Sequence, residues 1–143
     1  MNVKQILNLK GSRTVATIPP TARVHEATRT LAGKGYGALV VSDGEGAVDG
    51  ILSERDIVRG LGTEGAACLE KPVTSLMTVK VETCAPNESV LSVMERMTAG
   101  RFRHMPVVEG GKMVGILSIG DVVKARILQI EEENSQMQTM LHG

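Results

Sequence analysis

The stretch Gly115–Val123, which reads GILSIGDVV, repeats the earlier stretch Gly50–Val58, which reads GILSERDIV. The similarity continues upstream, where Val81–Thr83 repeats the pattern of Val15–Thr17. An internal repeat of this kind indicates two copies of one structural unit. A copy of about 60 residues would be only marginally stable alone. We therefore predict that the two copies share one core in a pseudo-two-fold arrangement.

Composition restricts the class of protein. The 143 residues fit one compact domain, and a core must be aliphatic, because hydrophobic residues make up 42% and aromatic residues only 1%. A formal net charge of zero disfavours nucleic-acid binding. No apolar run approaches the roughly 18 residues of a membrane span, and the start of the chain lacks a long apolar stretch. We therefore expect no membrane partner and a cytoplasmic location.

The residue pattern predicts an α/β (α+β) fold in which each repeat reads strand, helix, strand, strand, helix (β-α-β-β-α). In the second copy the predicted elements are a strand at 79–83, a helix capped by Asn87 or Ser89 and ended by Gly100, strands at 104–108 and 113–117, and a helix from 118. In the first copy they are a helix with Val24, Ala27 and Leu31 on one face, ended by 33–35, and strands at 38–41 and 48–52, joined by a turn at 43–46. Leu76-Met77 resembles Ile6-Leu7, so a small leading helix is expected in both copies. The predicted boundaries are 1–66 and 67–128 for the repeats and 129–143 for a helical tail.

Three side-chain types outside the repeated motif have a structural interpretation. Cys84 stands where the first copy has an apolar residue, so we expect a small buried side chain, and we assign no role to Cys68. Tyr36 and Phe102 occupy equivalent positions in the two copies, which favours core packing over stacking on a nucleotide base.

The tail carries apolar residues at heptad spacing. They are Val123, Ile127, Ile130, Met137 and Leu141, with Asn134 filling the gap in the series. Such a stripe is typical of helix-to-helix packing. It could fold back onto its own domain, but the narrow stripe and the charged opposite face at 131–133 favour packing against another chain.

Two Ser-x-x-Asp motifs, Ser53 with Asp56 and Ser118 with Asp121, each follow an apolar strand and open a helix. One interpretation is a capping box, in which the side chains satisfy free backbone N–H groups. The other is a nucleotide site, in which the carboxylate accepts hydrogen bonds from ribose hydroxyls and the helix N-terminus receives phosphate. The residues alone leave both open.

The repeated Gly-h-h-Ser-x-x-Asp corner, with 102–108 upstream of the second copy, resembles the cystathionine-β-synthase-type (CBS) domain. Two such domains in tandem form a Bateman module, and the layout is similar to small bacterial proteins that consist of one pair. The resemblance implies regulatory binding of an adenosyl ligand such as AMP, ATP, NAD(H) or S-adenosylmethionine in the cleft between the repeats. It also implies a homodimer through helical faces, for which the faces around Leu31 and Met97 and the tail are candidates.

The resemblance assigns roles residue by residue. Asp56 and Asp121 would hold ribose hydroxyls, and Ser53 and Ser118 would approach phosphate. The remaining candidates would line the cleft, meet the adenine edge or supply phosphate charge: Thr17, Ala38, Arg55, Thr83, Arg103 and His104. Residues 37–40 do not repeat the Arg103-His104 pair, whereas Arg55 has Gly120 as its counterpart. The two sites are therefore expected to differ.

We interpret the chain as a nucleotide-sensing regulatory module without catalysis or a metal, which transmits a conformational change to a protein that the sequence does not identify. Two rivals remain. One is a structural dimerisation module without ligand. The other is a nucleotide-hydrolysing enzyme, which would need a general base or metal cluster that the sequence does not suggest.

Overall fold

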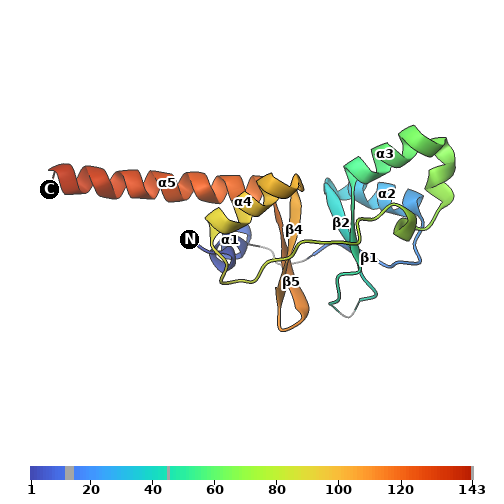
Figure 1. Cartoon of the computed structure of the whole chain (residues 1–143), viewed down its shortest axis with the longest axis horizontal. Helices are drawn as coiled ribbons and strands as arrows, with labels where there is room; N and C mark the ends of the chain where they lie inside the picture. Colours follow the sequence, from blue (N-terminus) through green and yellow to red (C-terminus); the bar gives the residue numbers. More distant parts are fainter. Residues whose placement is uncertain (12–14, 45, 143) are drawn as a thin grey trace. The chain divides into compact units, whose positions relative to one another are not determined.

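The structure is a computed structural model that describes residues 1–11, 15–44 and 46–142 (Figure 1). Glu45, within the predicted turn at 43–46, lies outside them. The elements in chain order are α1 (Val3–Lys10), β1 (Thr17–Ile18), α2 (Val24–Lys34), β2 (Ala38–Val41), β3 (Gly50–Ser53), α3 (Glu54–Glu64), the 3₁₀ helices η1 (Gly65–Glu70) and η2 (Val73–Ser75), α4 (Val90–Gly100), β4 (His104–Glu109), β5 (Lys112–Ser118) and α5 (Ile119–His142). This order confirms the α/β fold and the helical extension.

The elements fall into two compact units. The α5 unit contains α1, α4, β4, the end of β5 and α5. The α3 unit contains β1, α2, β2, β3, α3, η1, η2 and the tip of the β4–β5 hairpin. The helix that precedes the first repeat therefore belongs to the unit built from the second repeat. The boundaries at 66 and 128 remain a prediction.

The α3 unit is built on a three-stranded sheet in the order β1-β2-β3. β1 runs parallel to β2, with Thr17 opposite Val40, and β3 runs antiparallel to β2, with Ala38 opposite Ser53. All four residues of β2 are buried. The apolar face predicted for α2 is confirmed, since Val24, Ala27 and Leu31 pack in the same core. β3 begins at Gly50, two residues later than predicted.

The α5 unit contains the two-stranded sheet β4-β5. The predicted strand at 79–83 is wrong. Cys84, just after this segment, forms a parallel bridge to Val107 of β4, in which the Cys84 N–H donates to the Pro106 carbonyl. The preceding residues form no ladder, and Val79 is exposed. The β-branched residues that suggested a strand thus lie in a connecting segment, because β propensity needs a neighbouring strand to take effect.

Helix α4 starts at a predicted N-cap, but the residue that caps its C-terminal end is an unexpected one. The Ser89 hydroxyl accepts a hydrogen bond from the Ser92 N–H at 3.1 Å, which confirms Ser89 as the N-cap. Gly100 is the last helical residue, but the left-handed position after it is taken by Arg101, at φ 56°. A Cβ on Gly100 would lie 2.4 Å from the Phe102 ring. We infer that the glycine is needed here for space rather than for its backbone angles.

The leading segments contact each unit at equivalent glycines. A Cβ on Gly50 would lie 2.6 Å from Met77 Sδ, and one on Gly115 would lie 2.7 Å from Leu7 Cδ2. The predicted similarity of Leu76-Met77 to Ile6-Leu7 thus extends to their packing. The second leading segment is however a short 3₁₀ helix, η2, rather than an α-helix.

One interpretation of an apolar residue is wrong, because Tyr36 is 39% exposed and does not belong to the core. Leu31 and Met97 are themselves buried, and the faces around them remain a predicted dimer surface.

The long helix α5 carries the predicted stripe on an exposed face, so the stripe does not fold back onto the described chain. Within the described residues, no helix combines the length and apolar character that crossing a membrane requires.

Candidate functional site

Both Ser-x-x-Asp motifs lie where a strand ends and a helix begins. Ser53 is the last residue of β3 and the N-cap of α3, and Ser118 ends β5 immediately before α5. The first N–H groups of a helix have no partner within the helix. These corners therefore place helix N–H donors beside a serine and a carboxylate, which suits both capping and anion binding.

At the first corner, the Asp56 carboxylate is almost fully buried. Its Oδ2 accepts hydrogen bonds from the Ser53 N–H at 2.9 Å and the Ser53 hydroxyl at 3.0 Å. The Asp56 N–H donates in return to Ser53 Oγ at 3.2 Å. The other carboxylate oxygen lies 3.9 Å from a guanidinium nitrogen of Arg59. The capping box is therefore formed, with one face of the carboxylate directed to a positive charge.

At the second corner the same capping bonds are made with one added contact. Asp121 Oδ2 accepts from the Ser118 N–H at 2.9 Å, and the Asp121 N–H donates to Ser118 Oγ at 3.1 Å. The ammonium of Lys10, at the end of α1, lies 2.9 Å from the same Oδ2 and donates to the Ile116 carbonyl at 2.8 Å. A lysine from outside the motif thus neutralises this carboxylate.

The contacts of Asp121 set its ionisation. Burial acts to raise the pKa of this carboxyl group, but the Ser118 N–H and the Lys10 ammonium hold the pKa below the ordinary value of 3.8. The carboxylate is therefore charged at neutral pH and can accept hydrogen bonds from a ligand.

The residue before β2 and the residue before β4 each accept a backbone hydrogen bond from the corner of their own unit. The Glu54 N–H donates to the Gly37 carbonyl at 3.0 Å, and the Ile119 N–H donates to the Arg103 carbonyl at 2.8 Å. These bonds bring Ala38 and His104, which begin β2 and β4, next to the corners. Ala38 is buried and Arg103 is exposed.

The threonine candidates lie on the neighbouring chain segment of each unit. Thr17 is exposed on β1, beside β2. The Thr83 carbonyl accepts a hydrogen bond from Arg96 at 2.8 Å, and Arg96 also pairs with Glu88 at 2.8 Å. Arg55 is exposed in the first turn of α3. Thr17, Ala38, Ser53, Arg55 and Asp56 belong to the α3 unit, and Thr83, Arg103, His104, Ser118 and Asp121 belong to the α5 unit.

The thiol of Cys84, beside β4, is unreactive. Burial, followed by the charge of Glu88, raises the pKa of Cys84 to about 12. The side chain is 5% exposed, and its Sγ lies 3.8 Å from the Pro106 carbonyl oxygen. Since the thiolate is the nucleophile in cysteine chemistry, Cys84 is a packed apolar side chain at neutral pH, as predicted.

The repeated corner agrees with the comparison with known proteins, because the CBS domain matches twice, over residues 3–63 and 73–128. The chain belongs to the CBS domain family. CBS-domain pairs are regulatory modules. Among the residues described, no group of three or more His, Cys, Asp or Glu side chains is placed to hold a metal ion.

The relatives of this CBS pair include a protein of Agrobacterium tumefaciens, whose crystal structure is 47% identical with a TM-score of 0.84 and covers 88% of this chain and 99% of its own. A mitochondrial CBS domain-containing protein of Arabidopsis thaliana is 36% identical over 84% of this chain. The chain spans 60% of that relative's length and 21% of two other Arabidopsis relatives.

Two similar CBS structures contain adenosyl ligands. One, from Pyrobaculum aerophilum, is complexed with AMP; it is 27% identical with a TM-score of 0.74 and covers 85% of this chain and 89% of its own. The other is the CBS pair of the protein MJ0100, in complex with 5-methylthioadenosine and S-adenosyl-L-methionine; it is 25% identical with a TM-score of 0.78 and covers 90% of this chain and 98% of its own.

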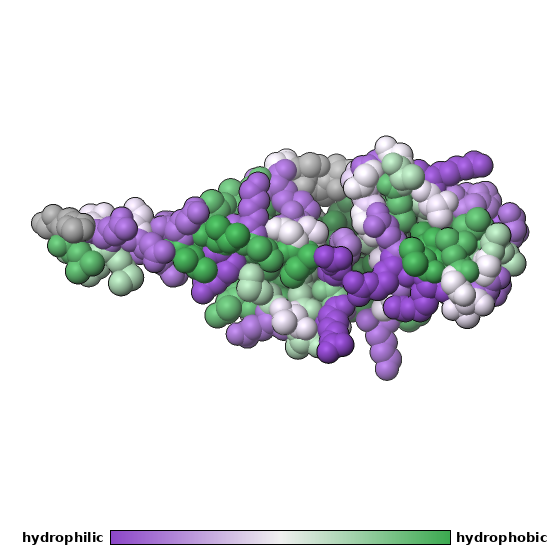
Figure 2. Space-filling model, turned by 90° about the horizontal axis from the view of Figure 1, so that it is seen from above, coloured by the Kyte–Doolittle hydropathy of each residue, from purple (hydrophilic) through white to green (hydrophobic). Residues whose placement is uncertain are grey.

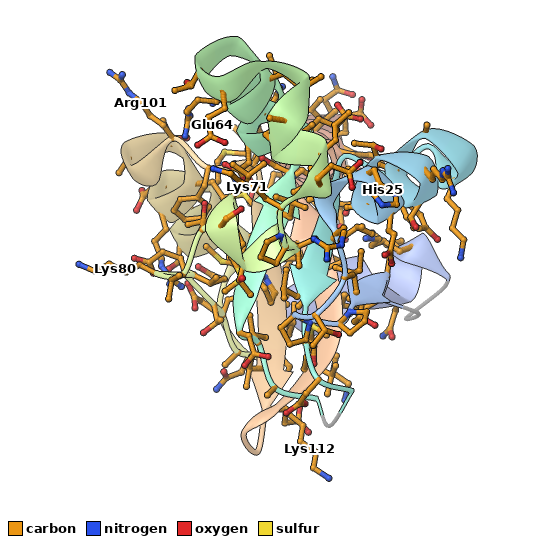
Figure 3. All side chains as sticks on the ribbon, turned by 90° about the vertical axis from the view of Figure 1, so that its right-hand side faces the viewer. His25, Glu64, Lys71, Lys80, Arg101 and Lys112 are labelled. Atoms are coloured by element: carbon orange, nitrogen blue, oxygen red, sulfur yellow. The ribbon has the colours of Figure 1, made fainter. Side chains whose placement is uncertain are left out.

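Sequence reasoning missed Lys10. The available signal was the repeat of Ile6–Lys10 (ILNLK) as Leu76–Lys80 (LMTVK), but no pattern states which carboxylate a lysine reaches. Lys80, the counterpart of Lys10, is exposed and points away from the protein (Figure 3). The difference arises because α1 continues helically to Lys10, whereas η2 ends at Ser75 and Thr78 then pairs with Ile51.

Replacing Lys10 should make the free energy of unfolding depend less on pH in the acidic range. Because the folded pKa of Asp121 is depressed, the ion pair stabilises the protein above the unfolded pKa of about 4, and this stabilisation is lost as pH falls through the folded pKa. Both side chains are partly exposed. Lys10→Met should therefore lower the free energy of unfolding by about 0.5–1 kcal/mol at pH 7, measured by urea denaturation, and the difference should narrow near pH 2.5.

Lys80→Met is the matched control, because this lysine has the same place in the repeat and an exposed side chain. It should change stability by no more than about 0.5 kcal/mol at either pH. Equal losses in the two variants at pH 7 would show that the Lys10–Asp121 pair has no net effect.

Proposed function

We propose that this CBS pair is a regulatory module that binds an adenosyl nucleotide, with AMP, ATP and NAD(H) as the candidates, and has no catalytic activity of its own. The observation that carries the proposal is that the two corners have the same geometry. Both keep the serine, the aspartate and the reciprocal hydrogen bonds between them. The AMP and S-adenosylmethionine complexes of similar CBS pairs support an adenosyl ligand.

In this proposal the carboxylates of Asp56 and Asp121 accept hydrogen bonds from the two ribose hydroxyls. The N–H groups of Arg55 and Gly120, in the first turns of α3 and α5, receive phosphate together with Ser53 and Ser118, which a helix N-terminus favours. The N–H groups on either side of them already donate within the protein. The exposed guanidinium of Arg103 adds positive charge at the second corner. The capping bonds hold each carboxylate in place before ligand arrives, which reduces the entropy lost on binding.

Further candidates complete each corner. The backbone at Ala38 and His104 would contact the adenine edge, because these residues start the strands beside the corners. Thr17 and Thr83 would line the ribose and base. Arg55, whose counterpart is Gly120, would supply phosphate charge at the first corner. We infer that the two corners bind different ligands, or the same ligand with different affinity.

The structural capping role does not compete with this function, because one carboxylate can serve both. Asp56 uses Oδ2 for its bonds to Ser53 and directs Oδ1 toward Arg59. A ligand at either corner would favour one conformation of the module and so pass a signal to a regulated protein. Ligand contributes to such a shift only through its different affinity for the two states.

Saturating ligand should stabilise the protein. At about 100 times its dissociation constant, AMP, ATP or NAD(H) should add about 2.7 kcal/mol to the free energy of unfolding, because it binds the folded corners and not the unfolded chain. Calorimetry and thermal unfolding with each nucleotide measure this effect. S-adenosylmethionine belongs in the same series, and GTP controls for phosphate charge without adenine.

Two outcomes would replace the proposal. If none of the adenosyl ligands produces heat or stabilisation, the module acts in structure alone, as a dimerisation unit. If pure protein converts ATP or NAD(H) to products, and loss of Asp56 or Asp121 abolishes the turnover, the chain is an enzyme.

A further inference from the structure

Helix α5 has two apolar faces, and the described part of the chain covers one of them. Val122 and Ala125 are buried against the α5 unit, and α5 packs along α4. The side chains of the stripe are instead between 40% and 78% exposed: Val123, Ile127, Ile130, Met137 and Leu141. Figure 2 shows hydrophobic surface along this helix, interrupted by polar side chains. An exposed apolar stripe of this length indicates an interaction surface.

We propose that the partner of this surface is a second copy of the chain, bound through a parallel, in-register coiled coil of the two α5 helices. The stripe residues alternate steps of 4 and 3 once Asn134 is included, which is the heptad spacing that brings one seam to face a partner helix. In this heptad Ile127, Asn134 and Leu141 occupy a positions, and Ile130 and Met137 occupy d positions.

The polar residue in the seam favours a copy of itself as the partner. Asn134 is exposed on α5, at an a position between Ile130 and Met137. In a parallel, in-register pair it faces Asn134 of the second copy, and the two amides can hydrogen-bond to each other. In an antiparallel pair it would face an apolar d residue and lose that partner. A single asparagine at an a position is known to specify register and oligomeric state at a cost in stability.

The flanking charges favour the same arrangement. With Ile127 at a, Arg126 lies at g and Glu131 at the following e position. In a parallel pair each Arg126 faces Glu131 of the second copy, which gives two attractive pairs related by the two-fold axis. An antiparallel pair centred on the seam would instead set Glu131 and Glu133 against their own copies. Flanking charges of this kind determine helix orientation.

The seam is short, about two and a half heptads, so we expect association in the micromolar range rather than a tight dimer. Sedimentation equilibrium of the full chain between about 1 and 100 micromolar gives the dissociation constant. If the chain stays monomeric over this whole range, the proposal is wrong. The exposed stripe of α5 would then bind a different protein.

Ile130→Asp tests the seam, and Leu128→Asp is its matched control. Both residues are 40% exposed on α5, but Leu128 lies at a b position, away from the seam. Ile130→Asp should weaken dimerisation at least about tenfold, and Leu128→Asp should leave it within about twofold. Equal weakening by both variants would overturn the proposal. Nucleotide binding should be unchanged in both, which separates a failure here from a failure at the corners.

Orientation is tested by crosslinking and by charge exchange. Asn134→Cys should oxidise to a disulfide-linked dimer, whereas Glu132→Cys, on the outer face, should not. Arg126→Glu should weaken dimerisation about threefold to tenfold, and adding Glu131→Arg to it should restore affinity. Failure of the second change to restore affinity, or equal crosslinking at 132 and 134, would contradict the parallel arrangement.

Discussion

Gly50→Ala is expected to lower the free energy of unfolding by about 2–3 kcal/mol. The new Cβ would lie 2.6 Å from Met77 Sδ and 2.9 Å from the Thr78 carbonyl oxygen. The sulfur can move, but the carbonyl is held: it accepts the Ile51 N–H at 3.0 Å, and the Thr78 N–H donates to the Ile51 carbonyl at 2.8 Å. The backbone must therefore shift and weaken these two bonds, which join the second leading segment to β3. Urea denaturation of the two proteins measures the loss.

Gly115→Ala is the matched control within the repeat. Its Cβ would lie 2.7 Å from Cδ2 of Leu7, the far end of a flexible side chain. A rotamer change can relieve this contact, so the loss should be about 1 kcal/mol. Gly120→Ala has only the Ser118 hydroxyl, at 3.7 Å, and should be close to neutral. If Gly50→Ala proved no worse than Gly115→Ala, the fixed carbonyl would not limit this site.

Asp56→Asn is expected to weaken nucleotide binding at the first corner by about tenfold to hundredfold. The amide keeps one oxygen, which can still accept the Ser53 N–H, but it loses the second acceptor and the negative charge. A hydrogen bond to a charged group contributes about 1.5–3 kcal/mol, and the loss of ribose contacts should fall in that range. Stability should fall by only about 0.5–1 kcal/mol, since the cap remains and the dipole interaction is lost. Titration calorimetry and urea denaturation separate the two effects.

Loss of a cap alone is controlled by Gln5→Ala. Gln5 Oε1 accepts the Asn2 N–H at 2.9 Å in the capping box of α1, which is the bond that Asp56 makes to Ser53. This variant should reduce stability without affecting nucleotide affinity. If Asp56→Asn binds nucleotide normally while it unfolds more easily, the carboxylate is only a cap and the proposed function of this residue is wrong.

Two different ligands would suit the unequal corners. Asp56 lies 3.9 Å from the guanidinium of Arg59, whereas Asp121 lies 2.9 Å from the ammonium of Lys10. A ligand at the second corner meets a carboxylate whose charge is already balanced, and the lysine adds a cation that phosphate could use. The sequence predicted unequal sites from Arg55 and the Arg103-His104 pair, but the largest difference in contacts comes from a residue more than a hundred positions away.

The sequence by itself determined the features that depend on neighbouring residues. The repeat of GILSERDIV as GILSIGDVV predicted the strand-to-helix corners, because an apolar strand followed by Ser-x-x-Asp satisfies the helix start locally. The periodicity of Val24, Ala27 and Leu31 predicted the buried face of α2, and the heptad spacing predicted the exposed stripe of α5. Each of these patterns acts within one or two helical turns or one strand.

Only the tertiary structure decided which distant segments meet. It packs α1 with the second repeat, so that Leu7 lies on Gly115 and Lys10 pairs with Asp121. It also leaves residues 79–83 without a strand partner and turns Tyr36 outward. These outcomes depend on contacts between residues far apart in the chain, whose energies no local pattern encodes. The repeat made both leading segments look alike, and the longer helix of the first one decided that only Lys10 reaches a carboxylate.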